Sequence, residues 1–471
     1  MRRLAIGACA LVLGCAREAA RPPPRPNVLL ITIDTLRADR LSCAGYGRPT
    51  TPQLDRLAAE GLRFTHVETP RAKTTPAIAS LMTSLFPHEH GVRELLTPLA
   101  PRSPLLAEAL RSAGYATHAI VGNYVLQDRF SGLARGFESW SEELPDIQGV
   151  PPDDVPQRRA RSMTDGALAA LDLGRAADRP WFLWLHYMDP HGLYDPPPAH
   201  RIFHRVVADP IPDDPGKTAG ELHRFHVASY NVPPGCTTPD GHVDAALVRD
   251  LYDGEVHYVD AEIGRLLDAL RAAGALEKTL VVVTADHGES LGEHRYWFEH
   301  GRDTYETTCR VPLIARLPGP PAPAVHDEDL SLVDLAPKML DWLHLPPLRP
   351  ASSARAVFAE KIERADLAGA VQAKAVRIGD WKMIRQYTHD AKGLVLVSEE
   401  LYDLARDPGE TANRMADPPE QAPLARLRAE LLGFAAADVR FPDIAKLLQA
   451  EREKLAREDP EALRILQKLG Y

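Results

Sequence analysis

The chain has 471 residues, of which 45% are hydrophobic and 25% charged, and this composition is typical of a folded globular protein. A chain of this length exceeds one ordinary hydrophobic core, so we expect a large domain with an appendage. Lys and Arg total 55 against 65 for Asp and Glu, and the net charge of −10 argues against a nucleic-acid binder, which presents a strongly basic surface.

The N-terminus has the pattern of an export signal. Two arginines precede an apolar run from Leu4 to Leu13, which is shorter than the roughly 20 residues that a membrane-spanning helix needs. Cys15 follows this run after one glycine and resembles the acylated cysteine of bacterial lipoproteins. We therefore expect a signal peptide over residues 1–15, a flexible tether over 16–26, and a lipid anchor at Cys15 as the only membrane attachment. The expected location is the bacterial periplasm or the outer surface, and an ordinary cleaved signal is the alternative.

Strands and helices alternate along most of the chain. Three segments, at residues 27–34, 180–191 and 279–290, start with apolar runs that predict strands buried on both faces of a sheet, and the last two end in polar clusters. Helices are predicted over 51–64, in the first part of 105–123 before a further strand, and from Val248 to Leu270. This alternation indicates an α/β fold with a doubly wound, mostly parallel sheet, in which the C-terminal ends of the strands carry the functional side chains.

The rest of the chain divides into a long loop, a small subdomain and a tail. Residues 192–246 are rich in Pro, His and Asp without periodicity, and a loop this long in a compact enzyme usually forms a lid or a substrate wall. From about residue 370, two segments have the pattern of paired strands in a small antiparallel sheet. We therefore divide the chain into a catalytic domain over 27–345, a C-terminal α+β subdomain over 346–437 and a charged helical tail over 438–471.

Candidate catalytic side chains stand close to the ends of the apolar runs. Asp34 follows the first predicted strand, and Asp286 and His287 follow the last one. Thr74 lies in the segment KTTPAIASLMTS. A buried carboxylate is costly unless it is paired or bound to a metal, so these strand ends indicate a metal site. For each residue taken alone, a structural role as a helix cap is a better interpretation than a role in a functional site. The combination of these residues with the flanking sequence favours the functional site.

The flanking sequence resembles the sulfatase family over residues 26–415, with the segments in the expected order. The opening NVLLITIDTLRADRLSCAGYG and the helix TPQLDRLAAEG are similar to the start of that family. TTPAIASLMTSLFPHEHGV resembles its nucleophile segment, and WFLWLHYMDPHGLYDPP resembles its central strand with a histidine. TADHGESLGEH and HGRDTYETTCRVPLIARLPG are similar to its second metal-binding stretch, and GDWKMIR and EELYDLARDPGETAN to its C-terminal subdomain. The resemblance implies an alkaline-phosphatase-like α/β sandwich with a small C-terminal α+β subdomain.

The same resemblance implies a metal centre and a substrate site. The implied metal ligands are Asp34, Thr74, Asp286 and His287. Thr74 also stands at the position of the nucleophile, and His191 and His300 stand where family members contact the anionic oxygens of the substrate or its leaving group. A divalent cation lowers the pKa of the nucleophile and holds the tetrahedral anion, while the imidazoles neutralise or protonate the departing oxygen.

Four positions depart from the family pattern. Sulfatases use a formylglycine that is made by oxidising Cys or Ser, and Thr74 stands at that position here. Oxidation of threonine would give a ketone and not an aldehyde, so the hydrated-aldehyde mechanism is closed to this residue. The other departures are Ile78 in place of an arginine, Thr35 in place of a second metal carboxylate and Gly301 in place of a lysine.

Threonine at this position resembles another branch of the superfamily, which includes phosphodiesterases, phosphonate hydrolases and lipid phospho-transferases. In that branch the threonine alkoxide attacks phosphorus and forms a phosphothreonine. We therefore predict a hydrolase of sulfate or phosphate esters, with small-molecule, glycan or lipid esters as substrates, and the chemistry favours phospho-esters. A transferase of phospho-headgroups in the cell envelope and an inactive binding protein with this fold are the alternatives.

The implied ligands also indicate which metal is bound. One histidine and a threonine oxygen beside two carboxylates favour Mn²⁺ or Zn²⁺ over Ca²⁺ or Mg²⁺. The predicted cofactor is therefore one divalent metal ion. A second metal held by Asp189, His191 and His300 is left open by the sequence.

Overall fold

The computed structural model describes residues 25–144, 157–172, 179–204, 207–212, 226–349, 356–361, 371–390 and 393–438, together with residue 457. The expected signal peptide, its lipid anchor and most of the tether and the tail lie outside the described residues. Within the described ranges, no helix is long and apolar enough to cross a membrane.

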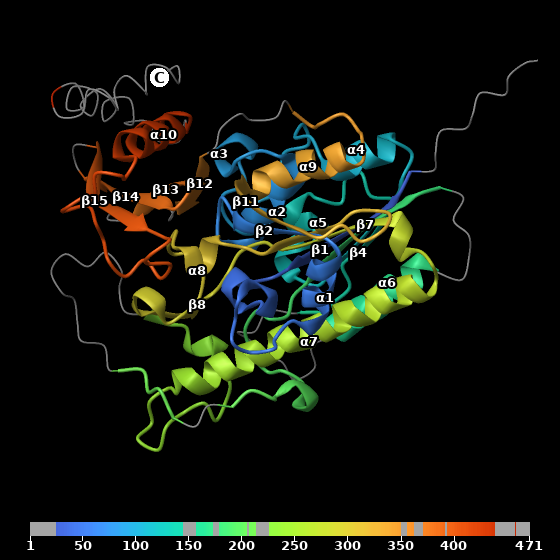
Figure 1. Ribbon diagram of the computed structural model, residues 1–471, viewed down its shortest axis with the longest axis horizontal. Helices are drawn as coiled ribbons and strands as arrows, with labels where there is room; N and C mark the ends of the chain where they lie inside the picture. The colour runs from blue at the N-terminus through green and yellow to red at the C-terminus, as the bar shows by residue number, and fades with distance from the viewer. Residues whose placement is uncertain are drawn as a thin grey trace, which may run out of the picture.

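An eight-stranded sheet forms the centre of the larger domain (Figure 1). Its central strands are β1 (Asn27–Ile33), β3 (Ala116–Val121), β5 (Trp181–Tyr187) and β7 (Thr279–Ala285). The three apolar runs that were predicted as buried strands form β1, β5 and β7, and β1 pairs in parallel with both of the others. Every residue of β5 and β7 is buried, as expected of parallel strands that are covered on both faces.

The other four strands complete the sheet in the order β11-β2-β10-β7-β1-β5-β3-β4. They are β2 (Leu62–Glu68), β4 (Ser139–Ser141), β10 (Leu313–Arg316) and β11 (Ala324–Ser331). β10 runs antiparallel to both of its neighbours, and the remaining pairs are parallel. The predicted mostly parallel sheet is therefore confirmed.

Helices cover the two faces of this sheet as separate layers (Figure 1). One layer contains α1 (Pro52–Glu60), α6 (Ala160–Leu171) and α7 (Ala245–Ala272), and the other contains α2 (Thr74–Thr83), α4 (Leu106–Ser112) and α9 (Leu335–Trp342). α7 includes the helix predicted from Val248 and begins earlier. Asp244 caps it by accepting hydrogen bonds from the backbone N–H groups of Ala246 and Leu247, so the additional residues join the helix.

The helix predicted over residues 51–64 ends earlier than the sequence pattern indicates. α1 stops at Glu60, and Leu62 already belongs to β2. Between them, Gly61 passes so close to β10 that an added Cβ would lie 2.4 Å from the carbonyl oxygen of Ala315. The pairing of β2 with β10 and β11 therefore overrides the helical spacing of the apolar residues.

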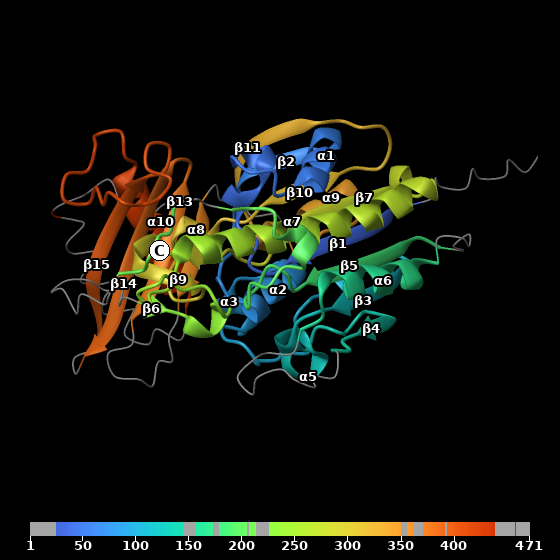
Figure 2. The ribbon, with the colours of Figure 1, turned by 90° about the horizontal axis from the view of Figure 1, so that it is seen from below.

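A small antiparallel sheet and α10 (Leu424–Ala436) form the C-terminal subdomain at one end of the larger domain (Figure 2). In sheet order, its strands are β12 (Val357–Lys361), β13 (Gln372–Ile378), β14 (Trp381–Asp390) and β15 (Gly393–Asp403). Leu427, Leu431 and Phe434 of α10 share a hydrophobic cluster with residues of these strands. The predicted antiparallel sheet of the C-terminal subdomain is therefore confirmed.

A buried ion-pair network connects this subdomain to the larger domain. Lys382 on β14 is fully buried, with its Nζ 2.9 Å from Glu306 and 3.1 Å from Glu410. Glu306 begins α8 (Glu306–Cys309) and also lies 2.9 Å from Arg377 on β13. Because these groups are shielded from water, each charge depends on its partners in the network.

Replacing Lys382 by methionine should destabilise the fold by about 3–5 kcal/mol, because it leaves two buried carboxylates without their shared cation. Denaturant unfolding measures this loss. Arg406→Ala is the matched control, since the Arg406 side chain is 75% exposed and its ion pair with Asp403 spans 2.8 Å. Loss of such a surface pair should change stability by less than about 1 kcal/mol. Equal effects of the two changes would contradict the stabilising role of the buried network.

Candidate functional site

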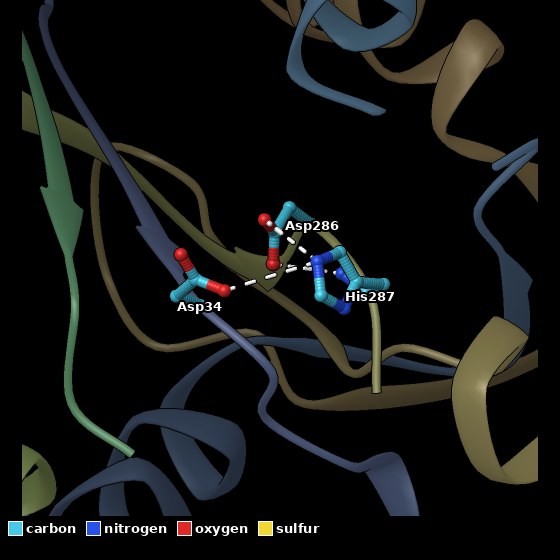
Figure 3. Close-up of side chains that lie close together, drawn as sticks. All are labelled: Asp34, Asp286 and His287. Carbon is cyan, nitrogen blue, oxygen red and sulfur yellow. Dashed lines mark hydrogen bonds and ion pairs between the residues drawn. The ribbon is translucent and has the colours of Figure 1, made fainter. Parts of the chain in front are cut away.

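Adjacent strands bring Asp34, Asp286 and His287 together at the C-terminal edge of the central sheet (Figure 3). Ile33 at the end of β1 pairs with Ala285 at the end of β7, so the residues that follow them lie side by side. The three side chains are fully buried, and one ligand atom from each lies within 4.8 Å of the others. Among the described residues, this is the only group of three or more His, Cys, Asp or Glu side chains with such spacing.

The two carboxylate donor atoms of this group face His287 without a hydrogen bond of their own. Asp34 Oδ1 and Asp286 Oδ2 are buried without a hydrogen-bond partner and lie 3.8 and 3.4 Å from His287 Nε2. Nδ1 of His287 donates to the carbonyl oxygen of Gly288 at 2.9 Å, so Nε2 carries a lone pair. Two carboxylate oxygens and an imidazole lone pair repel one another at these distances unless a cation binds them. The donor set therefore fits a divalent metal ion.

Burial and neighbouring charges determine the protonation of these groups. Burial raises the pKa of Asp286 well above its ordinary value, and the carboxylate of Asp34 adds to the shift. Burial acts in the same direction on Asp34, but the hydrogen bond from His186 and the nearby histidines outweigh it and lower the pKa of Asp34. Burial and the neighbouring His300 lower the pKa of His287 well below its usual range. This ring is therefore neutral, which is the form that binds a metal.

Thr74 lies beside this group as the first residue of α2. Its Oγ1 is 3.5 Å from Nε2 of His287, and 3% of the residue is exposed. All of α2 is buried, so packing holds this side chain in place. The N-terminus of a helix carries a partial positive charge, which favours an oxyanion at this position. The hydroxyl therefore lies next to the donor atoms of the candidate metal group.

His300 and His191 extend the cluster. The ring centroid of His300 lies 4.3 Å from that of His287 and 5.2 Å from that of His191. Nδ1 of His300 donates to Oε1 of Glu289 at 3.1 Å, and Oε2 of Glu289 accepts a hydrogen bond from the Tyr194 hydroxyl at 3.0 Å. Burial lowers the pKa of His300, but the charge and hydrogen bond of Glu289, together with the charges of Glu299 and Asp34, outweigh burial and raise this pKa to about 9. At neutral pH, His300 therefore carries a positive charge that can bind or protonate an anionic oxygen.

Sequence reasoning missed three residues of the site, namely Asn123, His186 and Glu289. Asn123 Nδ2 donates to Oδ2 of Asp34 at 2.6 Å, and His186 Nε2 lies 3.3 Å from the same oxygen. Glu289 is the buried acceptor of His300. Two of these residues carried a signal: Asn123 follows β3 at the edge of the sheet where Asp34 follows β1, and His186 interrupts the apolar run WFLWLHY.

The structure also shows what occupies the positions that depart from the family pattern. Ile78 is fully buried in the hydrophobic core, where it replaces an arginine. Gly301 has a φ of 83°, and an added Cβ would lie 2.9 Å from Cε of Lys73, which forms an ion pair with Glu94. A lysine side chain therefore lies beside residue 301, although it belongs to Lys73. Thr35 has a φ of 55°, and its buried Oγ1 has no hydrogen-bond partner.

Asp189 does not join His191 and His300. Its Oδ1 lies 2.9 Å from Nε of Arg159, and its Oδ2 accepts a hydrogen bond from the N–H of Ala160 at 2.7 Å. In the part of the chain that the structure describes, the one group with metal-ligand spacing is the group around His287. The arrangement gives no support to the second metal that the sequence left open.

Comparison with known proteins shows the family of this chain. The family model described as Sulfatase matches residues 26–345. The N-acetylglucosamine-6-O-sulfatase of Bacteroides thetaiotaomicron is 26% identical in an alignment of 480 positions, gaps included, that covers 85% of this chain and 84% of the relative. The choline-sulfatase of Rhizobium meliloti is 27% identical in an alignment of 440 positions that covers 84% of this chain and 83% of the relative.

A solved structure shows the same architecture. The phosphonate monoester hydrolase SpPMH from Silicibacter pomeroyi matches with a TM-score of 0.67 and 24% identity, over 88% of this chain and 96% of that one. This likeness confirms the alkaline-phosphatase-like fold that the sequence predicted. Since the Sulfatase model spans most of the chain, this protein belongs to the sulfatase family of the alkaline phosphatase superfamily and is an ester hydrolase.

Proposed function

We propose that this chain hydrolyses sulfate or phosphate esters by direct attack of Thr74, assisted by one divalent metal ion. The residues that would hold the ion are Asp34, Thr74, Asp286 and His287. The observation that supports this most is the 3.5 Å contact between Thr74 Oγ1 and His287 Nε2, beside buried carboxylate oxygens that have no hydrogen-bond partner. Mn²⁺ or Zn²⁺ is favoured, since an imidazole nitrogen accompanies the oxygen ligands.

The side chains of the site have separate roles in this reaction. When bound, the metal would lower the pKa of the Thr74 hydroxyl and neutralise the anionic ester. Thr74 Oγ1 loses its proton to solvent and forms a bond to phosphorus or sulfur, while the bond from that atom to the leaving alcohol breaks. His300, held by Glu289, donates a proton to the departing oxygen, and His191 contacts the anionic oxygens. Water then attacks the phosphorus or sulfur atom, the bond from that atom to Thr74 Oγ1 breaks, and the anion leaves while Oγ1 regains a proton.

Phospho-esters are the favoured substrates. Thr74 cannot form the aldehyde on which sulfatases depend, and Ile78 cannot supply the positive charge of the arginine that it replaces. The same fold serves a phosphonate monoester hydrolase. The relatives named above are sulfatases of an amino sugar and of choline, so small-molecule and glycan esters fit this proposal as well as lipid esters do.

A parallel assay of nitrophenyl sulfate, phosphate, phosphodiester and phosphonate tests this preference. We expect the metal-loaded protein to have its highest kcat/KM on one of the three phosphorus compounds. Turnover of the sulfate alone would contradict the preference for phospho-esters. The absence of turnover on all four substrates would contradict the proposed hydrolysis and favour an inactive binding protein.

We also propose that the protein is exported and anchored by a lipid at Cys15, since a basic start and a short apolar run precede this residue. Metabolic labelling with palmitate should mark the wild type and leave the Cys15→Ser variant unlabelled. A label that persists in the variant would contradict this anchor.

A further inference from the structure

The two oxygens of the Asp34 carboxylate have opposite surroundings. Oδ2 accepts a hydrogen bond from Asn123 Nδ2 at 2.6 Å and lies 3.3 Å from His186 Nε2. Oδ1 is buried without a hydrogen-bond partner and lies 3.8 Å from His287 Nε2. The protein therefore holds one oxygen and leaves the other for the metal group.

A buried chain of hydrogen bonds continues from His186 away from the metal group. Nδ1 of His186 lies 2.9 Å from Oγ1 of Thr32, and the indole N–H of Trp184 donates to the same Oγ1 at 2.9 Å. Asp34, Thr32, Trp184 and His186 are all fully buried. Water therefore does not compete for these bonds, and the chain connects the sheet interior to the carboxylate.

The donors in this chain determine which ring nitrogen of His186 carries the proton. The Trp184 indole can only donate, so Thr32 Oγ1 accepts a hydrogen bond from Trp184. The hydroxyl proton of Thr32 is then available for donation to Nδ1 of His186. Nε2 of His186 then carries a proton and donates to Asp34 Oδ2. If Nδ1 of His186 carried the proton instead, the Thr32 hydroxyl would donate to the more distant Leu185 carbonyl, at 3.3 Å. The lone pair on Nε2 of His186 would then face Asp34 Oδ2 and repel it. The first arrangement is therefore favoured.

We propose that Asn123 and His186 are positioning residues, which set the rotation of the Asp34 carboxylate and so present Oδ1 as the metal ligand. Thr32 takes part by fixing the proton of His186 on Nε2. This inference rests on the metal site of the proposed function. Hydrogen bonds to the ligands of a metal reduce the reorganisation that binding requires, and their loss typically weakens metal affinity by about 10- to 100-fold.

Calorimetric titration of the metal-free protein with Mn²⁺ and with Zn²⁺ tests this role without an activity assay. We expect the Kd of Asn123→Ala and of His186→Ala to rise by about 10- to 100-fold. His186→Gln should recover most of the affinity, because the glutamine amide can donate to Oδ2 as His186 Nε2 does. Thr32→Val should raise the Kd by a smaller factor, since it removes the proton donor of His186 and leaves the imidazole in place.

His90→Ala is the matched control for His186→Ala. His90 is also buried with both ring nitrogens bonded, because Nε2 lies 2.9 Å from Ser80 Oγ and Nδ1 accepts from the N–H of Val92 at 3.0 Å. Its loss should lower stability and leave the Kd unchanged. This comparison separates a positioning role from a general loss of packing.

The outcomes distinguish this inference from the proposal on which it rests. Wild-type affinity in both Asn123→Ala and His186→Ala would overturn the positioning role and leave the metal site intact. If His186→Gln binds the metal as weakly as His186→Ala does, the proposed donor role of His186 Nε2 is wrong. If the wild type binds neither Mn²⁺ nor Zn²⁺, the metal site of the proposed function fails instead.

Discussion

Thr74→Ala should reduce kcat on the preferred substrate by a factor on the order of 10⁴ or more, because the change removes the proposed nucleophile. The fold should survive, since the substitution deletes one hydroxyl and one methyl group at the start of a helix, where alanine is well tolerated. Steady-state kinetics measures the loss, and metal titration of the same variant shows whether the rest of the donor group is intact.

Two further substitutions show whether the hydroxyl itself is responsible. Thr74→Ser keeps the oxygen and should retain part of the activity. Thr75→Ala is the matched control, because Thr75 is the next residue of α2, is fully buried, and donates its hydroxyl to the Val125 carbonyl at 3.3 Å and not to the metal group. This control should lose some stability and keep its turnover.

The intermediate provides an independent measurement. Mass spectrometry of acid-quenched enzyme should find a phosphate, or with a sulfate substrate a sulfate, on the peptide that contains Thr74. Full activity of Thr74→Ala would instead show that a metal-bound water attacks the substrate. That result would also remove the main chemical reason for preferring phospho-esters.

The sheet interior could be predicted from the sequence, whereas its outer strands could not. The runs that form β5 and β7 are buried along their whole length, and such strands are mostly apolar. β2 reads as the end of a helix, because Leu62 and Phe64 continue the apolar spacing of α1. Helix α1 ends before Gly61, where the backbone lies close to the Ala315 carbonyl. That contact joins residues far apart in the chain and leaves no local pattern.

The site could be predicted in part for a similar reason. Asp34, Asp286 and His287 were expected together because they follow the ends of predicted strands, and the structure brings their donor atoms within 4.8 Å. The residues that orient Asp34 were missed. Asn123 and His186 are 89 and 152 residues away in sequence, and only the order of β1, β5 and β3 in the sheet places them beside it.

Removal of the metal should lower the melting temperature of the wild type by several degrees and abolish turnover. A ligand that binds only the native state stabilises it by about 2.7 kcal/mol when its concentration is a hundred times Kd. Chelation followed by a thermal scan measures the loss, and addition of Mn²⁺ or Zn²⁺ should reverse it. Unchanged stability and activity in a protein shown to be metal-free would contradict a metal-dependent mechanism.

Asp286→Asn should make the melting temperature insensitive to added metal. Asp286 Oδ2 is buried without a hydrogen-bond partner, so a bound cation would balance the charge of this carboxylate. The neutral amide of asparagine binds a divalent cation more weakly than a carboxylate does. Asp253→Asn is the matched control, because the Asp253 carboxylate is equally buried but lies 2.7 Å from Arg48 and 3.3 Å from Arg40. Since the two arginines balance the charge of Asp253, Asp253→Asn should destabilise the fold with or without metal and leave the response to metal unchanged. A wild-type response to metal in Asp286→Asn would contradict the assignment of Asp286 as a ligand.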